Sequence, residues 1–257
     1  MANYQSFAKD LLNVRIYDEE TEMGKASADF AAEHLNSTIK NRGSANLILA
    51  TGTSQFSFLG ALQNKELDWS KITVFHLDEY VGISDKHPAS FRKYLKERIL
   101  DIVKPGKYYL IDGDAENIVE GIAEYERVLK EYPIDLACIG IGENGHIAFN
   151  DPPVADFNDP HLVKIVELDQ ACRMQQLNEG WFPSLEEVPK EAITLTITAI
   201  MNCKAIVCTV PGIRKAEAVN RTLNGPINTE CPATILRNHP EAVLFLDNYS
   251  STEIKID

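Results

Sequence analysis

The sequence predicts an α/β protein with a single doubly wound, mostly parallel sheet, helices on both faces and a lid segment. Strand-like apolar runs alternate with helix-like amphipathic runs along most of the chain. Several apolar runs are continuous, which is typical of strands buried on both faces. The 257 residues suffice for one large domain, and no repeat or long linker divides them, so we expect a single domain over 1–257.

Seven apolar runs are the expected strands, at residues 47–50, 72–77, 136–141, 163–168, 193–197, 205–210 and 243–246. Between them, apolar residues recur near helical spacing, as Met23, Phe30 and Leu35 do. The expected helices cover residues 20–39, 57–63, 90–102, 116–132 and 215–223.

The segment of about residues 151–189, called the lid segment here, interrupts this alternation. It contains five prolines and the pair Trp181-Phe182. Prolines interrupt helices and central strands, so we expect a flap or lid with little regular structure rather than a second domain. The sequence leaves open whether Trp181 and Phe182 close over a ligand or pack in the core.

Composition excludes several classes of partner and site. A net charge of −13 disfavours nucleic acid and anionic membranes, although a small anionic substrate remains compatible with it. No signal-peptide pattern or transmembrane-length apolar run is present, so we expect a cytoplasmic protein. The five cysteines are odd in number and form no CxxC pair, which favours reduced thiols and argues against a zinc site.

The run 145–153, Gly-His-Ile-Ala-Phe-Asn-Asp-Pro-Pro, presents His146 on a turn just after the expected strand 136–141. Histidine is suited to proton transfer near neutral pH, and Asp151 five residues later could set its tautomer. Active sites of open α/β sheets lie past the carboxyl ends of strands. A surface turn with an incidental histidine fits the same residues.

Two further turns are candidates for binding an anion. Thr51, Gly52, Thr53 and Ser54 lie between an expected strand and an expected helix, where backbone N–H groups suit a phosphate. Lys215 follows the expected strand 205–210 and could reach the same phosphate. The alternatives are an ordinary N-capped turn and a surface lysine.

Asp78 and Glu79 end the expected strand 72–77. Adjacent side chains on a strand point to opposite faces, so at most one of the two is expected to face the chemistry. A carboxylate general base fits that position, and a solvated turn is the alternative.

The glycines at 140, 142 and 145 match the spacing of a dinucleotide-binding loop, with Asp169 downstream. That loop requires a helix directly after the glycines, whereas Asp151-Pro152-Pro153 ends this segment. We therefore expect no NAD and no other cofactor.

Taken together, these motifs resemble the glucosamine-6-phosphate deaminase (isomerase) family over nearly the whole chain. The family's order is preserved in residues 50–54, 75–82, 87–91, 140–152, 211–215 and 232–239. The pair Leu-Asp-Glu-Tyr-Val-Gly and Gly-His-Ile-Ala-Phe-Asn is the most specific part. The related 6-phosphogluconolactonases share the fold and a Gly-His turn but lack the Phe-Asn-acid continuation.

The resemblance implies a role for each motif. Asp78 matches the base that moves a proton between C2 and C1 of the opened sugar. His146 matches the residue that opens the pyranose ring, and Asp151 matches a glutamate that tunes it. Residues 51–54 and Lys215 match the phosphate site. The reaction needs no metal and no redox cofactor.

Three departures from the family pattern concern the substrate more than the reaction. Asn144 replaces an aspartate found in some members, and Glu143 beside it could supply the lost charge. Asp151 is one methylene shorter than the usual glutamate. A lid arginine that binds phosphate in many members has no clear match, and Arg173 is the candidate for that role.

The sequence thus predicts an enzyme that converts glucosamine 6-phosphate and water to fructose 6-phosphate and ammonia. The alternatives are galactosamine 6-phosphate as substrate, lactone hydrolysis, and a non-catalytic sugar-phosphate sensor. The expected partner is a small amino-sugar phosphate, without nucleic acid or membrane. A homo-oligomer is compatible with the resemblance, because related enzymes occur as monomers and as oligomers.

Overall fold

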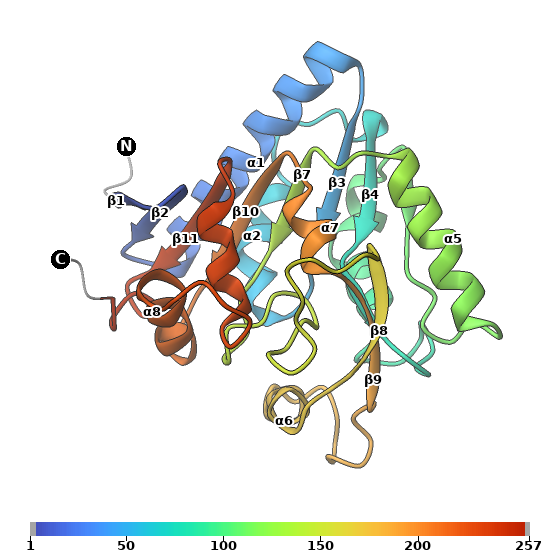
Figure 1. Ribbon diagram of the computed structural model, residues 1–257. Helices are drawn as coiled ribbons and strands as arrows, with labels where there is room; N and C mark the ends of the chain where they lie inside the picture. Colours follow the sequence, from blue (N-terminus) through green and yellow to red (C-terminus); the bar gives the residue numbers. More distant parts are fainter. Residues whose placement is uncertain (1–3, 255–257) are drawn as a thin grey trace.

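In the computed structural model, which describes residues 4–254, the main sheet has eight strands (Figure 1). Only the first pair is antiparallel, and the other neighbours are parallel. The spatial order is β1 (Tyr4–Lys9), β2 (Leu12–Tyr17), β11 (Ala242–Asp247), β10 (Ala205–Val210), β7 (Leu136–Ile139), β3 (Ala45–Leu49), β4 (Ile72–His76) and β6 (Lys107–Tyr109).

A second, antiparallel sheet has the strand order β5 (Asp78–Tyr80), β9 (Glu191–Leu195) and β8 (Val163–Glu167). Two predicted strands, 163–168 and 193–197, therefore lie here and not in the main sheet. The expectation of a single sheet is corrected on this point. Hydrophobic periodicity identifies a strand but does not choose its partner, and these pairings are set by where the chain turns after β4.

Strands β1, β2, β5 and β6 were not predicted. The first two form a hairpin at the sheet edge, and most of β1 is exposed. The last two have three residues each, too few to show a period.

Helices cover both faces of the main sheet, as predicted. One face carries α1 (Glu20–Arg42), α2 (Phe56–Leu62), α3 (Phe91–Leu95) and α4 (Asp101–Val103), and the other carries α5 (Ile118–Glu131), α7 (Ile197–Met201) and α8 (Ala216–Asn224). Alternate residues of β3 face opposite layers: Leu47 and Leu49 pack with α1 and α2, whereas Ile48 packs with α5. None of the helices within residues 4–254 is long and apolar enough to cross a membrane.

The lid segment is more regular than its prolines suggested. It contains strand β8 and helix α6 (Gln170–Asn178), which lie between Pro160 and Pro183. Asp169 caps α6 by accepting a hydrogen bond of 2.6 Å from the Cys172 backbone N–H. The strand expected at 163–168 is confirmed as β8, whereas the prediction of little regular structure is wrong for residues 170–178, because the prolines flank α6 and do not interrupt it.

Candidate active site

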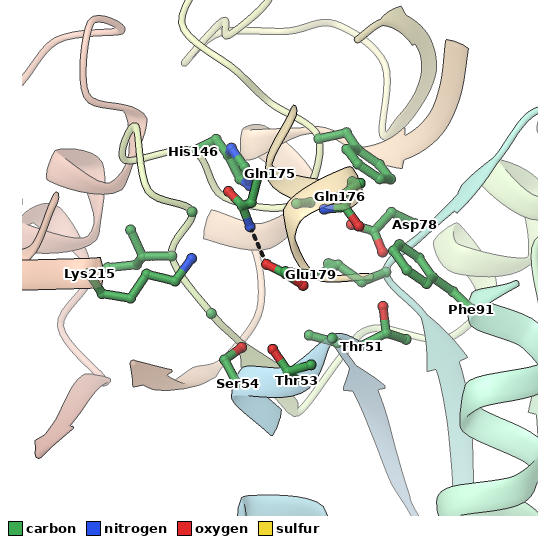
Figure 2. Close-up of a pocket in the computed structure, with 18 residues that line it drawn as sticks. Thr51, Thr53, Ser54, Asp78, Phe91, His146, Gln175, Gln176, Glu179 and Lys215 are labelled. Carbon is green, nitrogen blue, oxygen red and sulfur yellow. Dashed lines mark hydrogen bonds between the residues drawn. The ribbon is translucent and has the colours of Figure 1, made fainter. Parts of the chain in front are cut away.

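The turns after β3, β4, β7 and β10 meet at the carboxyl ends of these strands, where they line one cavity of about 100 Å³ (Figure 2). The turns supply residues 51–54, Asp78, His146 and Lys215, in that order. Four sequence motifs up to 164 residues apart are thus brought together, because parallel neighbouring strands end at the same edge.

The turn after β3 has a geometry that requires glycine. Gly52 has φ 95° and ψ 167°, a region that side chains exclude. Its carbonyl accepts a 2.7 Å hydrogen bond from the Tyr94 hydroxyl, which fixes the peptide. Thr51, Thr53 and Ser54 line the cavity next to it (Figure 2).

Lys215 lines the same cavity from the turn after β10 (Figure 2). Burial lowers the pKa of its ammonium group, while the nearby Glu179 and Glu143 carboxylates act in the opposite direction. A buried ammonium group that lacks bulk water gains most from a bound anion. The threonine and serine hydroxyls of the turn 51–54 and this ammonium group together form a site suited to binding a phosphate.

Asp78 and Glu79 face opposite sides of β5, as predicted. Asp78 lines the cavity, whereas the buried Glu79 carboxylate accepts hydrogen bonds from Ser90 Oγ (2.9 Å) and from the backbone N–H groups of Phe91 (3.1 Å) and Arg92 (2.9 Å). Burial raises the pKa of Asp78 to about 8, and the charge of Glu79 adds to this rise. Asp78 can therefore both hold and release a proton near neutral pH.

The partly buried His146 forms a pair with the buried Asp151, in which Nδ1 lies 2.8 Å from Oδ1 of Asp151. Asn144 Nδ2 donates to the same carboxylate oxygen at 2.7 Å, and Asn144 Oδ1 accepts from the His146 backbone N–H at 3.0 Å. Burial alone would raise the pKa of Asp151, but His146 outweighs it and the pKa is lowered. The carboxylate thus holds Nδ1, which leaves Nε2 for proton exchange.

Glycine at 142 is required by the position of the histidine ring. A Cβ atom at Gly142 would lie 2.2 Å from the His146 imidazole. The segment from 143 to 150 contains turns and an isolated bridge, not the helix of a dinucleotide-binding loop. Gly142 therefore serves close packing around His146.

Four predicted residues do not line the cavity: Asn144 and Asp151, which hold His146 from behind, and Glu143 and Arg173, which bond elsewhere. Glu143 forms an ion pair with Arg214 at 2.5 Å, so its carboxylate is directed to Arg214 and does not join the hydrogen bonds of Asn144, His146 and Asp151. Arg173 donates to the backbone carbonyls of Leu185 and Val188 within the lid segment. Its guanidinium is used to hold that segment together, and the contacts do not support a phosphate-binding role.

Helix α6 contributes residues that the sequence analysis missed. Gln175, Gln176 and Glu179 line the cavity (Figure 2), and together with Cys172 they follow the i, i+3, i+4, i+7 spacing of one helix face. This polar stripe could have predicted that one face of α6 lines the site, but we expected the lid segment to be irregular. Gln176 Oε1 accepts a 2.7 Å hydrogen bond from the Tyr80 hydroxyl, which joins α6 to β5.

The structure answers the question about Trp181 and Phe182. Phe182 is buried and packs edge-on against Tyr80, with ring centroids 5.5 Å apart. Trp181 is half-buried, and its Nε1 donates to Glu179 Oε2 at 3.2 Å. Phe182 is therefore a core residue, and Trp181 supports a residue of the cavity.

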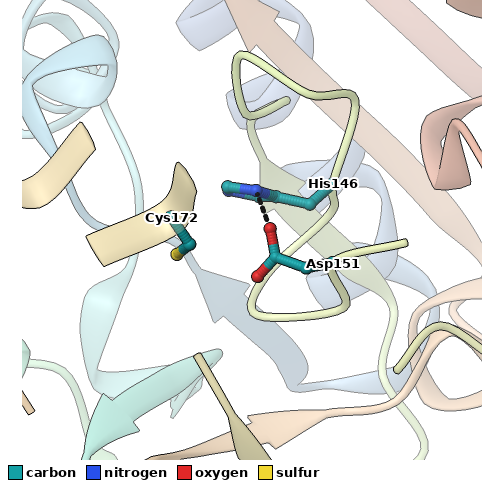
Figure 3. Close-up of side chains that lie close together, drawn as sticks. All are labelled: His146, Asp151 and Cys172. Atoms are coloured by element: carbon teal, nitrogen blue, oxygen red, sulfur yellow. Dashed lines mark hydrogen bonds and ion pairs between the residues drawn. The ribbon is translucent and has the colours of Figure 1, made fainter. Parts of the chain in front are cut away.

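His146, Asp151 and Cys172 lie close together, with their potential ligand atoms within 4.8 Å of one another (Figure 3). Burial and the charge of Asp151 raise the pKa of the Cys172 thiol, which keeps it protonated. His146 Nδ1 and Asn144 already use one oxygen of Asp151. The three side chains therefore form a hydrogen-bonded cluster. They fit a zinc ion poorly, because zinc binds the thiolate form of cysteine and the Cys172 thiol is protonated.

The fold and the site together define an α/β protein with acid–base groups and an anion-binding turn in one cavity. The family model of glucosamine-6-phosphate isomerases/6-phosphogluconolactonase matches residues 18–245. The chain belongs to this family.

Several relatives are similar over most of the chain. The glucosamine-6-phosphate deaminase of Streptococcus suis (strain 05ZYH33) is 33% identical over 244 residues, which cover 95% of this chain and 100% of the relative. That of Bacillus cereus (strain B4264) is 34% identical over 236 residues, 92% of this chain and 87% of the relative.

Solved structures show the same fold. A monomeric glucosamine-6-phosphate deaminase superposes with a TM-score of 0.84 at 30% identity, covering 93% of this chain and 99% of the other. A 6-phosphogluconolactonase from Shewanella baltica OS155 has a TM-score of 0.76 at 19% identity, covering 91% and 97%. The second likeness concerns the fold alone.

We expect Asp78→Asn to stabilise the protein increasingly as pH rises. The folded-state pKa of Asp78, about 8, lies above the ordinary value of 3.8, so the folded state binds this proton more tightly than the unfolded state. The wild type therefore loses stability between about pH 4 and pH 8, whereas asparagine does not titrate. Calorimetry should give a Tm gain of about 3–8 °C at pH 8.5 and little gain at pH 4. A gain independent of pH would contradict the assigned pKa.

We expect Gly142→Ala to displace the His146 ring and to destabilise the protein by about 1–3 kcal/mol. The matched control is Gly121→Ala in α5, where the nearest atom to a new Cβ lies 3.9 Å away. Urea unfolding measures the stability, and NMR of the imidazole nitrogens reports whether Nδ1 still bonds Asp151. Unchanged imidazole signals in Gly142→Ala would show that the ring does not depend on this glycine.

Proposed function

We propose that the protein is an amino-sugar phosphate deaminase that converts glucosamine 6-phosphate and water to fructose 6-phosphate and ammonia. The observation that carries this proposal is the shared cavity of Asp78, His146, Lys215 and residues 51–54. It combines a carboxyl base, a carboxylate-held imidazole and an anion site. The deaminase relatives, similar over most of their length, support the same reaction.

The phosphate is held between the hydroxyl-rich turn 51–54 and Lys215. In Figure 2 Lys215 and Ser54 lie at the opposite end of the site from Asp78, whereas Thr51 lies nearer to Asp78. A phosphate held at the Lys215 end anchors a flexible open-chain sugar away from the reacting carbons. Binding energy from such a remote group orients the reacting atoms.

His146 opens the pyranose ring. Its Nε2 accepts the proton of the C1 hydroxyl, the C1–O5 bond breaks to give the aldehyde, and the same proton passes to O5. Asp151 and Asn144 keep the imidazole oriented throughout, since they fix Nδ1 and the adjoining backbone.

Asp78 then moves a proton between two carbons. Its carboxylate removes the proton from C2 while a proton of the C2 ammonium group passes to O1, which gives an enolamine. Asp78 then returns its proton to C1, which gives the protonated C2 imine. Water adds to C2 and ammonia leaves, so the C2–N bond is replaced by the carbonyl of fructose 6-phosphate. A pKa of about 8 lets one carboxyl act first as base and then as acid.

The lid, the cellular compartment and the oligomeric state complete the proposed function. We assign the lid role to the lid segment within a single domain, because α6 forms one wall of the cavity. We place the protein in the cytoplasm, since all five cysteines are buried and unpaired, as a reducing compartment favours. A homo-oligomer stays a prediction that light scattering tests; the relative of known structure is described as monomeric.

The direct test is ammonia release by the purified protein. Glucosamine 6-phosphate, galactosamine 6-phosphate and 6-phosphogluconolactone are supplied in parallel, and we expect ammonia from glucosamine 6-phosphate. Asp78→Asn should lower turnover by at least about 10⁴-fold while sugar-phosphate binding survives, because only the base is lost. Hydrolysis of the lactone without ammonia would contradict the proposal, and ammonia from the galactosamine epimer alone would change its substrate.

His146→Gln should separate ring opening from the carbon chemistry. We expect turnover of the α-pyranose of glucosamine 6-phosphate to fall by about 10²–10⁴-fold, which is the usual contribution of a general acid–base group. The reverse reaction begins when ammonia condenses with open-chain fructose 6-phosphate to form the imine, and this condensation does not need the opening of the pyranose ring. Equal losses for imine formation and for ring opening would remove His146 from its assigned role.

A further inference from the structure

The carboxylate of Glu179 in the cavity has no use in the reaction described above. Glu179 follows α6 directly and lines the same cavity as Asp78 and Lys215, between them in the view of Figure 2. The Glu179 carboxylate is near enough to Lys215 to raise the pKa of its ammonium group, against the effect of burial. It therefore lies within electrostatic reach of the proposed phosphate site.

The Glu179 side chain is fixed in place by two neutral donors. Gln175 Nε2 donates to Oε1 at 2.8 Å, and Trp181 Nε1 donates to Oε2 at 3.2 Å. Within the described part of the chain, no lysine or arginine forms an ion pair with it. A carboxylate that is oriented by neutral groups keeps its charge available for a ligand.

This arrangement conflicts with simple anion binding. A carboxylate beside the turn 51–54 and Lys215 repels a phosphate dianion. The conflict disappears if the ligand also carries a positive charge. An amino-sugar phosphate carries an ammonium group at C2, the carbon from which Asp78 removes a proton.

We propose that Glu179 determines specificity by selecting a sugar phosphate with a positively charged amino group over the neutral sugar phosphates. This inference rests on the proposed deaminase function, because it takes the C2 amine to lie beside Asp78. Once ammonia has left, fructose 6-phosphate no longer offsets the Glu179 charge. The same carboxylate therefore weakens product binding and favours product release.

The test compares two ligands that cannot react, because neither has a carbonyl group. The first is 2-amino-2-deoxyglucitol 6-phosphate, and the second is glucitol 6-phosphate, in which a hydroxyl replaces the amine. Titration calorimetry at pH 7 measures both affinities for the wild type, Glu179→Gln and the control Glu187→Gln. Glu187 is an exposed carboxylate of the same lid segment that does not line the cavity.

We expect the wild type and Glu187→Gln to prefer the amino ligand. Glu179→Gln should lower this preference by about tenfold or more, with glucitol 6-phosphate bound as tightly as before or more tightly. An unchanged preference in Glu179→Gln, or an equal loss of both affinities, would overturn the inference. A wild type that binds neither ligand would overturn it as well.

The two proposals can fail separately in these experiments. If the wild type releases ammonia but Glu179→Gln keeps the full preference, the deaminase function stands and the role of Glu179 is wrong. If the wild type shows the Glu179-dependent preference but releases no ammonia, the amine selectivity stands and the deaminase function is wrong.

Discussion

The buried carboxylate of Glu79 is the contact on which the geometry of the site depends. It accepts hydrogen bonds from the backbone at the start of α3 and from Ser90, and Arg92 Nε lies 3.4 Å from it. These bonds hold β5 at the point where the chain leaves the main sheet. Because neighbouring side chains on a strand alternate, fixing Glu79 on one face directs Asp78 into the cavity on the other.

The same contact sets the chemistry of Asp78. Burial away from water, with the second buried carboxylate beside it, raises the pKa of Asp78 to about 8. The cost is a buried acid that destabilises the folded state near neutral pH, and such costs are typical of functional sites. The other acid of the site behaves in the opposite way: the pKa of Asp151 is lowered, because His146 is its direct partner. Two aspartates thus acquire different roles from their surroundings.

Residue type and position past a strand end were enough to predict Asp78, His146, Lys215 and the turn 51–54. Each of these sites needs only the local rule that parallel strands end together. Glu143 and Arg173 show the limit of that reasoning. Both carry suitable charges, but their side chains turn toward Arg214 and toward lid carbonyls, and those partners are known only once the chain has folded.

The fold shows the same division. The apolar runs predicted the buried strands but not β1, β2, β5 and β6, and the placement of β8 and β9 in a separate antiparallel sheet depends on tertiary pairing. The lid segment was expected to be irregular because of its prolines, and the polar stripe of α6 was not used to predict a helix there. Gln175 and Glu179 were missed for that reason, and they form one wall of the cavity.

The most direct measurement is the titration of the Asp78 carboxyl carbon by ¹³C NMR in the ligand-free protein, with Asp78→Asn to assign the signal. The account predicts a midpoint near pH 8, well above the ordinary 3.8. A midpoint near pH 4 would contradict it, because the carboxyl would then be an ordinary solvated group and not a base set by burial next to Glu79.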